Sequence, residues 1–438
     1  MVKEACGLKG EITLPGDKSI AHRTIIISGL APAKTVINNF PANQDCLATL
    51  KALKKFGLKI IQNNSCTVTV FGKGLHGLNK PKTPIFTGES GTTLRLLLGV
   101  LAGQNFQTRL IAGQSLSKRP MLRVNAPLRM MGAKITAKRK SPHDKEEYPP
   151  LTIRGGNLRA ISYKMPIPSA QVKSAILLAA LFACGKTRVK EPIRTRDHTE
   201  QMLKMFKADI KLKQNNVVIK GGCELVSCGR IDIPGDISSA SFFIVGAAIL
   251  PDSRLLIRNV SLNPLRIGLI KVLKRMGADI KVQKSSASRI YSNEPAGNII
   301  VRSSKLKGTV VKKKEIPSLI DELPILMVAA CCAQGATVFE GIGELRVKET
   351  DRIKSMLENL ASMGAQIKVV RYPKSENIII EAGKKLKGAK VKNFSDHRTA
   401  MSMVIAGLSA SGNTSIDSLD CINKSFPDFL TRLKPLIR

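Results

Sequence analysis

Lysine, serine and arginine residues with the spacing of an anion site open the first apolar helix predicted in this chain. The phrase LPGDKSIAHR places Lys18 and Ser19 at a glycine-bearing turn, and Arg23 lies one turn further along the same helix. Backbone N–H groups, the positive end of the helix dipole and a lysine together attract an anion. The phrase lacks the GxxxxGK spacing of a P-loop. Taken alone, it is explained equally well by a capped helix with a solvated lysine.

Three further helix openings carry residues of the same kinds. In GESGTTLR, Gly91 lets the backbone approach a ligand. In SLSKRPM, Arg119 precedes a proline and is held extended at the start of a helix. In SAQVKS, Ser169 and Gln171 offer a hydroxyl and an amide at another helix start. A simple helix cap is the plainer explanation of each one, but four such openings together favour sites for small phosphorylated anions.

Carboxylates accompany the cations in the second half of the chain. Asp321 and Glu322 lie at the mouth of an otherwise apolar helix, and ELRVKETDR (344–352) mixes acids and bases. DHR (396–398) opens the last apolar helix, and NKSFPDF contributes Lys424. Acids in a first helical turn are also ordinary dipole partners, and a run of charges is usually a solvated face. Because these charges stand at openings of apolar helices, they are candidates for acid–base chemistry.

The elements that would position these residues recur six times along the sequence. Each copy has an apolar run of helix length that ends in a polar or glycine-containing turn, and a short β-branched strand follows. The runs are apolar nearly all round, which indicates buried helices. Six such α/β units predict two globular domains of three units each. The six copies are residues 21–37, 92–111, 174–189, 239–257, 323–339 and 399–416.

A second phrase follows the first in most copies and reads as an amphipathic helix, a cap and a strand. Glycine at the cap suits a residue in the left-handed conformation. Lys207 stands where the other copies have glycine, so the sequence predicts a different cap geometry there. The cap positions are Gly57, Gly132, Lys207, Gly277 and Gly364.

The composition narrows the class of protein. The chain has 438 residues, and 70 Lys and Arg against 32 Asp and Glu give a formal charge of +38, which attracts polyanions. There is no Trp, only 13 Phe and 4 Tyr could stack on bases, and the lysines are spread along the chain. A basic site for small phosphorylated substrates therefore fits better than a nucleic-acid platform.

Cysteine, histidine and hydropathy patterns point to an ordinary intracellular protein. Nine cysteines without CxxC spacing argue against a disulfide framework or a thiolate zinc site. Five scattered histidines without an i,i+4 pair argue against a metal cluster. The apolar stretches are too short to cross a bilayer, and MVKEACGLKG contains no signal core. We expect a cytoplasmic protein without a metal or other cofactor.

The chain resembles the 5-enolpyruvylshikimate-3-phosphate synthase family of enolpyruvyl transferases over effectively its whole length. The resemblance rests on the combination of the phrases LPG-x-KS-xxx-R, G-x-x-GT, RPM, SAQ, RVKETDR, DHR and K-x-FPDF. The resemblance implies an α/β (α+β) fold, a two-domain inside-out barrel of six βαβαββ units with three per domain. It implies a discontinuous domain of residues 1–20 plus 235–438, which contains both termini, and an inserted domain of residues 21–234. Ligands would bind in the cleft between the domains.

The resemblance also implies the reaction. The family transfers the enolpyruvyl group of phosphoenolpyruvate to the 5-hydroxyl of shikimate 3-phosphate and releases phosphate, by addition–elimination through a tetrahedral intermediate. This step belongs to the shikimate pathway, which leads to chorismate and the aromatic amino acids. The implied partners are these two small molecules, with no cofactor, no specific nucleic acid and no membrane, and the implied state is a monomer.

Residue roles follow from the matched motifs. Asp321 matches the carboxylate that holds and deprotonates the 5-hydroxyl, and Glu349 and Lys424 are the candidates for proton transfer at the methylene carbon. Lys18 completes the catalytic set. The implied shikimate 3-phosphate contacts are Lys18, Ser19, Arg23, Ser169, Ala170, Gln171, Arg196, Asp321 and Lys348. The implied phosphoenolpyruvate contacts are Lys18, Gly91, Arg119, Gln171, Arg352, Arg398 and Lys424.

Three positions depart from the family pattern. Glu89 stands where Asn is usual and adds negative charge near an anion pocket, Ala170 replaces a frequent Ser, and Leu96 replaces a frequent Pro. Gly91, rather than Ala, leaves room for the inhibitor glyphosate, so we expect inhibition.

Two other functions remain open at this point. The sister enzyme that acts on UDP-N-acetylglucosamine usually carries a Cys near SLSKRPM, and residues 114–121 contain none. A basic nucleic-acid-binding protein would instead bind duplexes tightly and with a steep salt dependence.

Overall fold

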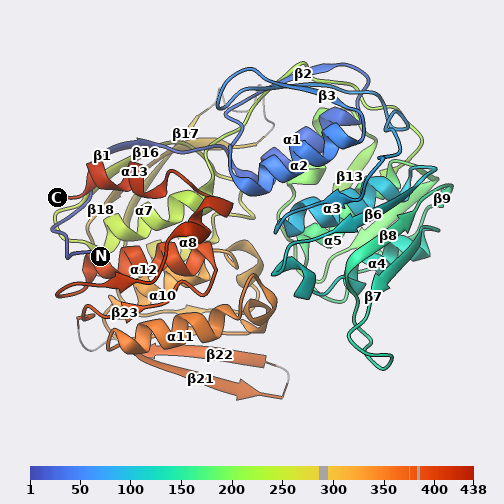
Figure 1. Ribbon diagram of the computed structural model, residues 1–438. Coiled ribbons are helices and arrows are strands. Elements are labelled where there is room, and N and C mark those ends of the chain that lie inside the picture. The colour runs from blue at the N-terminus through green and yellow to red at the C-terminus, as the bar shows by residue number, and fades with distance from the viewer. Residues whose placement is uncertain (286–293, 374, 382–384) are drawn as a thin grey trace. The chain divides into compact units, whose positions relative to one another are not determined.

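The computed structural model describes residues 1–285, 294–373, 375–381 and 385–438, and these residues form two compact units (Figure 1). Unit 1 contains Met1–Pro15, 234–285 and the described residues of Pro295–Arg438. Unit 2 contains Gly16–Ile233 together with Glu294. Each unit has a hydrophobic core of its own.

Unit 2 contains three four-stranded sheets with one pairing scheme. In each sheet the first strand pairs parallel with the second, and the third runs antiparallel to both of its neighbours. One sheet has the order β15 (Arg230–Asp232), β2 (Lys34–Asn38), β4 (Val68–Phe71) and β3 (Lys59–Gln62). The next has β5 (Ile85–Phe86), β6 (Gln107–Ile111), β8 (Tyr148–Arg154) and β7 (Lys134–Lys138). The last has β10 (Ser162–Lys164), β12 (Lys186–Lys190), β14 (Asn216–Lys220) and β13 (Ile210–Lys213), and β9 (Leu158–Arg159) pairs separately with β11 (Ala183–Cys184).

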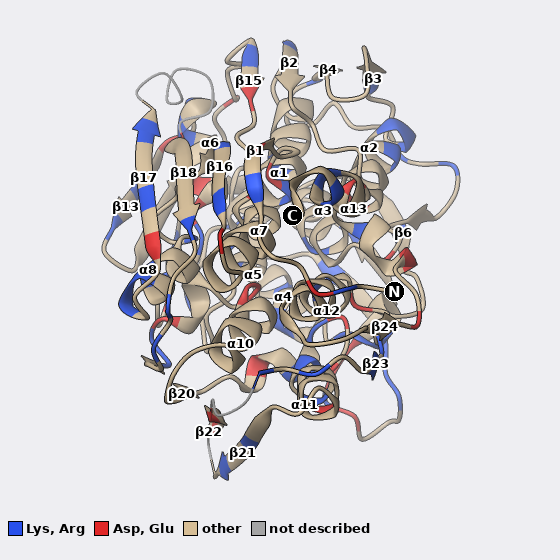
Figure 2. Ribbon diagram, turned by 90° about the vertical axis from the view of Figure 1, so that its left-hand side faces the viewer, with Lys and Arg blue, Asp and Glu red and all other residues tan. Residues whose placement is uncertain are grey.

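Unit 1 contains two more sheets with the same pairing scheme and one parallel strand pair. The first has the order β1 (Lys9–Thr13), β16 (Arg254–Ser261), β18 (Ala296–Arg302) and β17 (Asp279–Ser285), which lie side by side in Figure 2. The second has β19 (Val310–Val311), β20 (Ala336–Phe339), β22 (Ser375–Glu381) and β21 (Gln366–Tyr372). The pair is β23 (Lys390–Val391) with β24 (Ser415–Ile416).

Each of the six apolar runs contains a helix whose side chains are almost all buried, which confirms the prediction of buried helices. Because these helices bury side chains on nearly every side, they lie inside the cores of the two units. They are α1 (Lys18–Gly29), α3 (Gly91–Ala102) and α5 (Ala170–Ala180) in unit 2, and α7 (Ile237–Ile249), α10 (Leu323–Cys331) and α12 (His397–Ser409) in unit 1.

Amphipathic helices and short 3-10 turns complete the units. Unit 2 has α2 (Gln44–Lys55), α4 (Leu122–Met130), α6 (His198–Met205) and η1 (Leu116–Lys118). Unit 1 has α8 (Gly268–Arg275), α11 (Arg352–Ser362), α13 (Phe429–Leu433), η2 (Ile316–Ser318), η3 (Gly343–Val347), η4 (Asp420–Lys424) and η5 (Lys434–Leu436).

The prediction of a different cap geometry at Lys207 is wrong. Lys207 has φ 63°, in the same left-handed region as Gly57 at 83° and Gly364 at 86°. The amide of Lys207 donates to the carbonyl of Lys204 at 3.0 Å, and the next amide reaches the carbonyl of Leu203 at 2.9 Å. The chain must make this turn to pass from α6 into β13, and the turn imposes a conformation that costs a non-glycine residue about 1–2 kcal/mol.

Three features of the described residues bear on the expected class of protein. Among them, no helix is both long and apolar enough to cross a membrane. Within the same ranges, no group of three or more His, Cys, Asp or Glu side chains could hold a metal ion. All nine cysteines carry free thiols.

Candidate active site

The opening of α1 in unit 2 gathers several predicted residues. Asp17 caps the helix, because its carboxylate accepts from the amide of Ile20 at 3.0 Å. The Lys18 ammonium lies 3.1 Å from a carboxylate oxygen of Asp45. Ser19 accepts from the Arg196 guanidinium at 2.9 Å. The residues of the first phrase therefore lie together, and Arg196 joins them from a distant part of the sequence.

Arg23 is buried beside them and is bound by neutral groups. Its guanidinium donates to the hydroxyl of Thr199 at 2.7 Å, to the hydroxyl of Ser174 at 2.8 Å and to the carbonyl of Ser19 at 2.8 Å. Burial, and then the positive charge of Arg196, lower the pKa of Arg23 to about 10. The guanidinium still carries its charge at neutral pH and could bind an anion.

A buried ion cluster supports the helices that carry these groups. Lys173 of α5 lies 2.9 Å from Glu191 and 2.7 Å from Glu200 of α6, and all three side chains are at most 2% exposed. Burial alone would lower the pKa of Lys173, but Glu200 and Glu191 outweigh it and raise that pKa. Removing one member of such a cluster leaves a buried charge uncompensated, so the cluster fixes α5 relative to α6.

The opening of α3 forms a second group in unit 2. Arg95 donates to the side-chain oxygen of Gln171 at 2.5 Å, and Gln171 donates to the hydroxyl of Thr92 at 2.9 Å. A Cβ atom on Gly91 would lie 3.0 Å from Arg95 and 3.1 Å from Arg119. Two guanidinium groups thus lie close to Gly91, and a larger residue there would have to shift them by a few tenths of an ångström. Ser169 caps α5 next to this group and accepts from the amide of Val172 at 3.4 Å.

Glu89, the first departure from the family pattern, has a local structural role. Its carboxylate accepts from the backbone amides of Leu116 at 2.8 Å and Ser115 at 3.2 Å. These contacts hold the turn η1, which leads directly to Arg119. The added negative charge is therefore offset by two amide dipoles. Leu96 is fully buried in a regular α3.

In unit 1, the predicted base lies among arginines. The side chain of Asp321 is 17% exposed, with one carboxylate oxygen 3.8 Å from Arg266 and the other 3.9 Å from Arg352. Its backbone carbonyl accepts from Arg398 at 2.7 Å. The neighbouring Glu322 is fully buried and lies 3.2 Å from Arg266. Asp321 is thus the accessible carboxylate of the two, and the guanidinium groups beside it stabilise its negative charge.

Arg352 organises the remaining carboxylates of unit 1. It donates to Asp396 at 2.8 Å and to Glu349 at 2.6 Å. Asp396 in turn caps α12 by accepting from the amide of Arg398 at 2.8 Å. Although burial alone would lower the pKa of Arg352, Asp396 and Glu349 outweigh burial, and that pKa is raised.

The two predicted lysines of unit 1 lie at the edge of this cluster. Desolvation lowers the pKa of Lys348, and the nearby carboxylates, Asp321 first, reduce but do not cancel this effect. Lys424, at the end of η4, donates to the carbonyl of Ser395 at 3.3 Å, immediately before α12. Unit 1 therefore brings carboxylates, lysines and arginines together.

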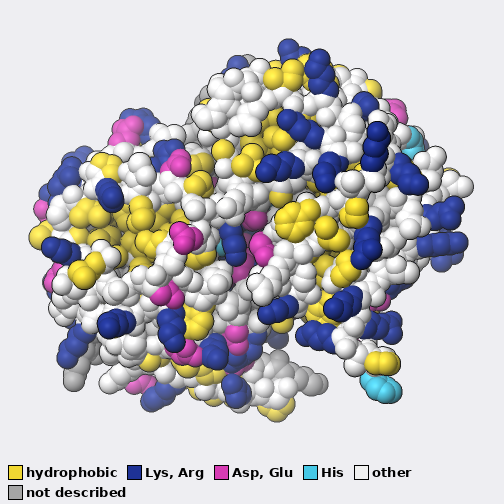
Figure 3. Space-filling model, in the orientation of Figure 1, with side chains coloured by type: hydrophobic (Ala, Val, Ile, Leu, Met, Phe, Trp, Pro, Cys, Tyr) yellow, Lys and Arg dark blue, Asp and Glu magenta, His cyan; other side chains and the backbone are white. Residues whose placement is uncertain are grey.

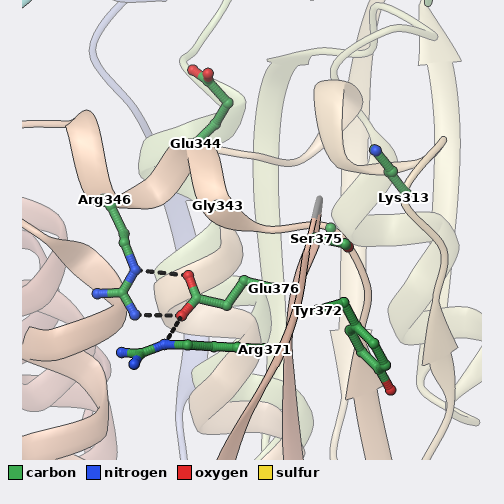
Figure 4. A pocket seen from close by; sticks show the side chains of 9 residues that line it. Lys313, Gly343, Glu344, Arg346, Arg371, Tyr372, Ser375 and Glu376 are labelled. Atoms are coloured by element: carbon green, nitrogen blue, oxygen red, sulfur yellow. Dashed lines mark hydrogen bonds and ion pairs between the residues drawn. The ribbon is translucent and has the colours of Figure 1, made fainter.

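A pocket of about 660 Å³ adjoins η3, which leads into Lys348 and Glu349 (Figure 4). In this pocket Arg346 and Arg371 both point toward Glu376 of β22. Arg346 binds the two carboxylate oxygens of Glu376 at 2.7 and 2.5 Å, and its third bond reaches Asp351 at 2.5 Å. The pocket is lined by Lys313, Gly341, Gly343, Glu344, Arg346, Arg371, Tyr372, Ser375 and Glu376.

Sequence reasoning missed several residues of these groups, among them Arg95, Asp396 and Arg266. Arg95 closes the phrase GESGTTLR and lies one helical turn after Gly91, a spacing that could have revealed it. Asp396 lies in the phrase DHR, whose helix-capping acid we had not given a role. Arg266 lies in no motif, and nothing in the sequence singled it out.

Comparisons with known proteins identify the family of the chain. Residues 2–433 match the family model described as EPSP synthase (3-phosphoshikimate 1-carboxyvinyltransferase). The chain belongs to this family. It is therefore an enzyme of the carboxyvinyl transferase class, and the predicted family and enzyme class are confirmed.

Curated relatives cover nearly all of the chain. The 3-phosphoshikimate 1-carboxyvinyltransferase of Desulforamulus reducens is 45% identical over 430 residues, which are 98% of this chain and 97% of that protein. The protein of the same name from Petrotoga mobilis is 46% identical over 424 residues, 96% of this chain and 95% of that protein.

Solved structures confirm the mixed α/β fold. EPSP synthase from Acinetobacter baumannii is 41% identical, covers 100% of this chain and 97% of its own, and gives a TM-score of 0.86. The enolpyruvyl transferase NikO from Streptomyces tendae covers 100% of this chain and 97% of its own, with a TM-score of 0.77 at 16% identity. The second likeness concerns the fold alone.

Proposed function

We propose that the chain transfers the enolpyruvyl group of phosphoenolpyruvate to the 5-hydroxyl of shikimate 3-phosphate and releases phosphate. The observation that carries this proposal is the family match over residues 2–433. The reaction lies in the shikimate pathway, which supplies aromatic amino acids. Both substrates are anions, and cations at several helix openings suit them.

The α1 group of unit 2 would bind shikimate 3-phosphate. Arg23 is buried and is hydrogen-bonded to neutral oxygens, so a phosphate would gain a strong charge-assisted interaction there. Ser19 and Arg196 lie beside it. The other contacts we assign to this substrate are Lys18, Ser169, Ala170, Gln171, Asp321 and Lys348.

The α3 group would bind phosphoenolpyruvate. Arg119 and the neighbouring Arg95 present two guanidinium groups at Gly91, and Gln171 is held by Arg95 and Thr92. We also propose inhibition by glyphosate, because Gly91 stands at this position rather than Ala. From unit 1 we assign Arg352, Arg398 and Lys424 to the same substrate, with Lys18 from unit 2.

Proton transfers would then be divided among the carboxylates and lysines. The 5-hydroxyl oxygen attacks C2 of phosphoenolpyruvate and gives its proton to Asp321, while the methylene carbon takes a proton from Glu349 or Lys424. The resulting tetrahedral intermediate loses phosphate as its methyl group returns a proton, and the enolpyruvyl double bond forms. Asp321 is partly exposed and lies between two guanidinium groups, a position that suits a carboxylate base.

The same family membership supports further features of the protein. We propose a two-domain inside-out α/β barrel of six βαβαββ units, with residues 1–20 plus 235–438 in one domain and 21–234 in the other. Substrates would bind between the two domains. The enzyme would be a cytoplasmic monomer that needs no cofactor and acts without a specific nucleic acid or a membrane.

Phosphate release from the purified enzyme tests the function. We expect release only when both substrates are present, and a loss of about 10²–10⁴-fold in kcat for Asp321→Asn, the range attributed to general acid–base catalysis. Asp209→Asn, at an exposed position in unit 2, is the matched control and should retain activity. Release with UDP-N-acetylglucosamine in place of shikimate 3-phosphate, or an active Asp321→Asn enzyme, would contradict the proposal.

A further inference from the structure

The exposed face of the sheet β10–β12–β14–β13 carries cations that the proposed reaction does not use. Along β12, Lys186, Arg188 and Lys190 are exposed, and the residues between them are buried. Strand alternation therefore points all three cations to one side. The other strands add four more, so the cationic sheet face consists of Lys164, Lys186, Arg188, Lys190, Lys211, Lys213 and Lys220, all exposed.

The strand register brings like charges directly opposite each other. Lys164 pairs with Lys190 across β10 and β12, and Lys186 pairs with Lys220 across β12 and β14. Like charges in such positions destabilise a sheet. Three strand spacings amount to about 14 Å, so these charges are concentrated in a small area. The face therefore carries an electrostatic cost that an external anion would remove.

Carboxylates do not compensate these charges. The four strands contain no Asp or Glu. In the part of the chain that the structure describes, none of the seven side chains forms an ion pair. The acid nearest in sequence is Glu191, which follows Lys190, but it is buried and pairs with Lys173.

The sheets of unit 1 differ, although the whole chain has a formal charge of +38 and Figure 3 shows many basic side chains at the surface. Arg302 of β18 lies 3.4 Å from Asp279 of β17, and Lys368 of β21 lies 3.5 Å from Glu381 of β22. Figure 2 shows blue and red segments together on β17. The cationic sheet face therefore differs from these two sheets, in which carboxylates lie beside some of the cations.

We propose that the cationic sheet face binds the phosphate backbone of double-stranded nucleic acid without reading its sequence. Alternate residues of a strand are about 7 Å apart, a spacing that suits a linear polymer with regularly repeated phosphates. The seven residues are all Lys or Arg, which bind phosphate as point charges or forks. Phosphate contacts fix position but carry no sequence information.

The cationic sheet face lacks the side chains that would bind single-stranded nucleic acid or a lipid surface. No aromatic side chain is exposed on these strands, because Tyr163 is half-buried between its exposed neighbours. Stacking of single-stranded bases is therefore not available. The only apolar residue on this side, Val218, is half-buried, so no apolar side chain is available to insert into a lipid surface.

Fluorescence anisotropy with labelled duplex DNA of two unrelated sequences tests the proposal. We expect equal affinities for the two sequences and a steep loss of affinity between about 50 mM and about 200 mM salt. A triple variant should bind the duplex at least about tenfold more weakly, and the slope of log affinity against log salt concentration should fall by about 3. Its substitutions are Lys186→Gln, Arg188→Gln and Lys190→Gln. Its phosphate-release activity and melting temperature should match those of the wild type.

A control with the same charge change separates this site from net charge. The variant Arg254→Gln, Lys281→Gln, Lys368→Gln removes three exposed cations from sheets of unit 1, and it should change affinity by less than about twofold. Equal losses in the two variants would show that net charge alone drives binding and would overturn the proposal. Absence of duplex binding at the lower salt would overturn it too, as would binding only to vesicles of anionic lipid.

Discussion

Two buried arginines, one in each unit, are stabilised in opposite ways. Arg23 is 2% exposed and Arg352 is 1% exposed, so water hydrates neither charge. Two hydroxyls and a carbonyl oxygen bind Arg23. Two carboxylates bind Arg352. Accordingly, the pKa of Arg23 is lowered to about 10 by burial and the charge of Arg196, whereas carboxylates outweigh burial and raise the pKa of Arg352.

The difference distinguishes a cation that neutral groups hold from a cation that holds two acids in place. Neutral partners orient Arg23 without cancelling its charge, so a bound phosphate would supply the missing negative charge. The carboxylates of Glu349 and Asp396 already balance much of the charge of Arg352, so in addition to the phosphoenolpyruvate contact that we propose, it fixes where these two acids lie. A cation at a helix opening can thus bind substrate or hold catalytic acids, according to what surrounds it.

Replacing Arg352 should give the largest effect on stability. Arg352→Met would leave two carboxylates without their cation, and removing one partner of a buried ion pair costs about 3–5 kcal/mol. We expect the free energy of unfolding in urea to fall by that amount and activity to be lost. Hydrogen exchange should accelerate in the peptides of unit 1 that contain α11 and α12.

Arg23→Met is the counterpart in unit 2 and should separate binding from stability. Its loss leaves only neutral partners, so the free energy of unfolding should change by about 1–2 kcal/mol. The KM for shikimate 3-phosphate should rise by about 100-fold, because a charge-assisted hydrogen bond contributes up to about 3 kcal/mol. If the two variants lost equal stability and the KM stayed unchanged, the comparison would fail.

Arg346 sharpens the comparison by testing a cation that holds two acids in place outside the site. Its bonds to Glu376 and Asp351 hold the segment that carries Lys348 and Glu349. Arg346→Gln should lower kcat by about tenfold with little change in the KM for phosphoenolpyruvate, since a shift in catalytic geometry of this kind corresponds to about 1.4 kcal/mol.

Two further variants show whether Arg346 acts through position. Arg346→Lys, which keeps the charge but not the two parallel bonds, should recover only part of the kcat. Arg371→Gln is the matched control, because Arg371 contacts the same Glu376 at 3.3 Å from an exposed position. An equal loss of kcat in the control would show that Glu376 needs any cation, not this one.

The sequence was sufficient to predict the buried helices and many of the residues that gather at the openings of α1 and α3 and around Asp321. Apolar runs predicted the six buried helices because burial on all sides leaves a local pattern. Charged phrases at helix openings likewise singled out Arg23 and Arg352, because polar residues at the start of a helix also leave a local pattern. Lys207 misled the prediction, because a turn required by the following strand overrode the preference of its residue type.

The partners of these residues could not be predicted from the same patterns. Arg23 lies 176 residues from Thr199 and 151 from Ser174, and only tertiary packing brings them together. Arg266 lies in no phrase at all. The cations of β10, β12, β13 and β14 looked dispersed along the chain, since cross-strand register is invisible until the pairing is known.

Lys348 provides the smallest and most specific test, through pH. Desolvation lowers its pKa from the ordinary 10.5 of lysine, so it loses its proton earlier than an exposed lysine as pH rises. Between the lowered value and 10.5 the unfolded chain binds more protons, and the contribution of Lys348 to stability therefore rises with pH.

The attraction of Lys348 for a phosphate falls over the same interval. As pH rises toward 10.5, the KM for shikimate 3-phosphate should rise more in the wild type than in Lys348→Arg, whose guanidinium stays charged. Parallel profiles for the two enzymes would remove Lys348 from the substrate contacts and leave anion binding to the residues of unit 2 and the other cations of unit 1.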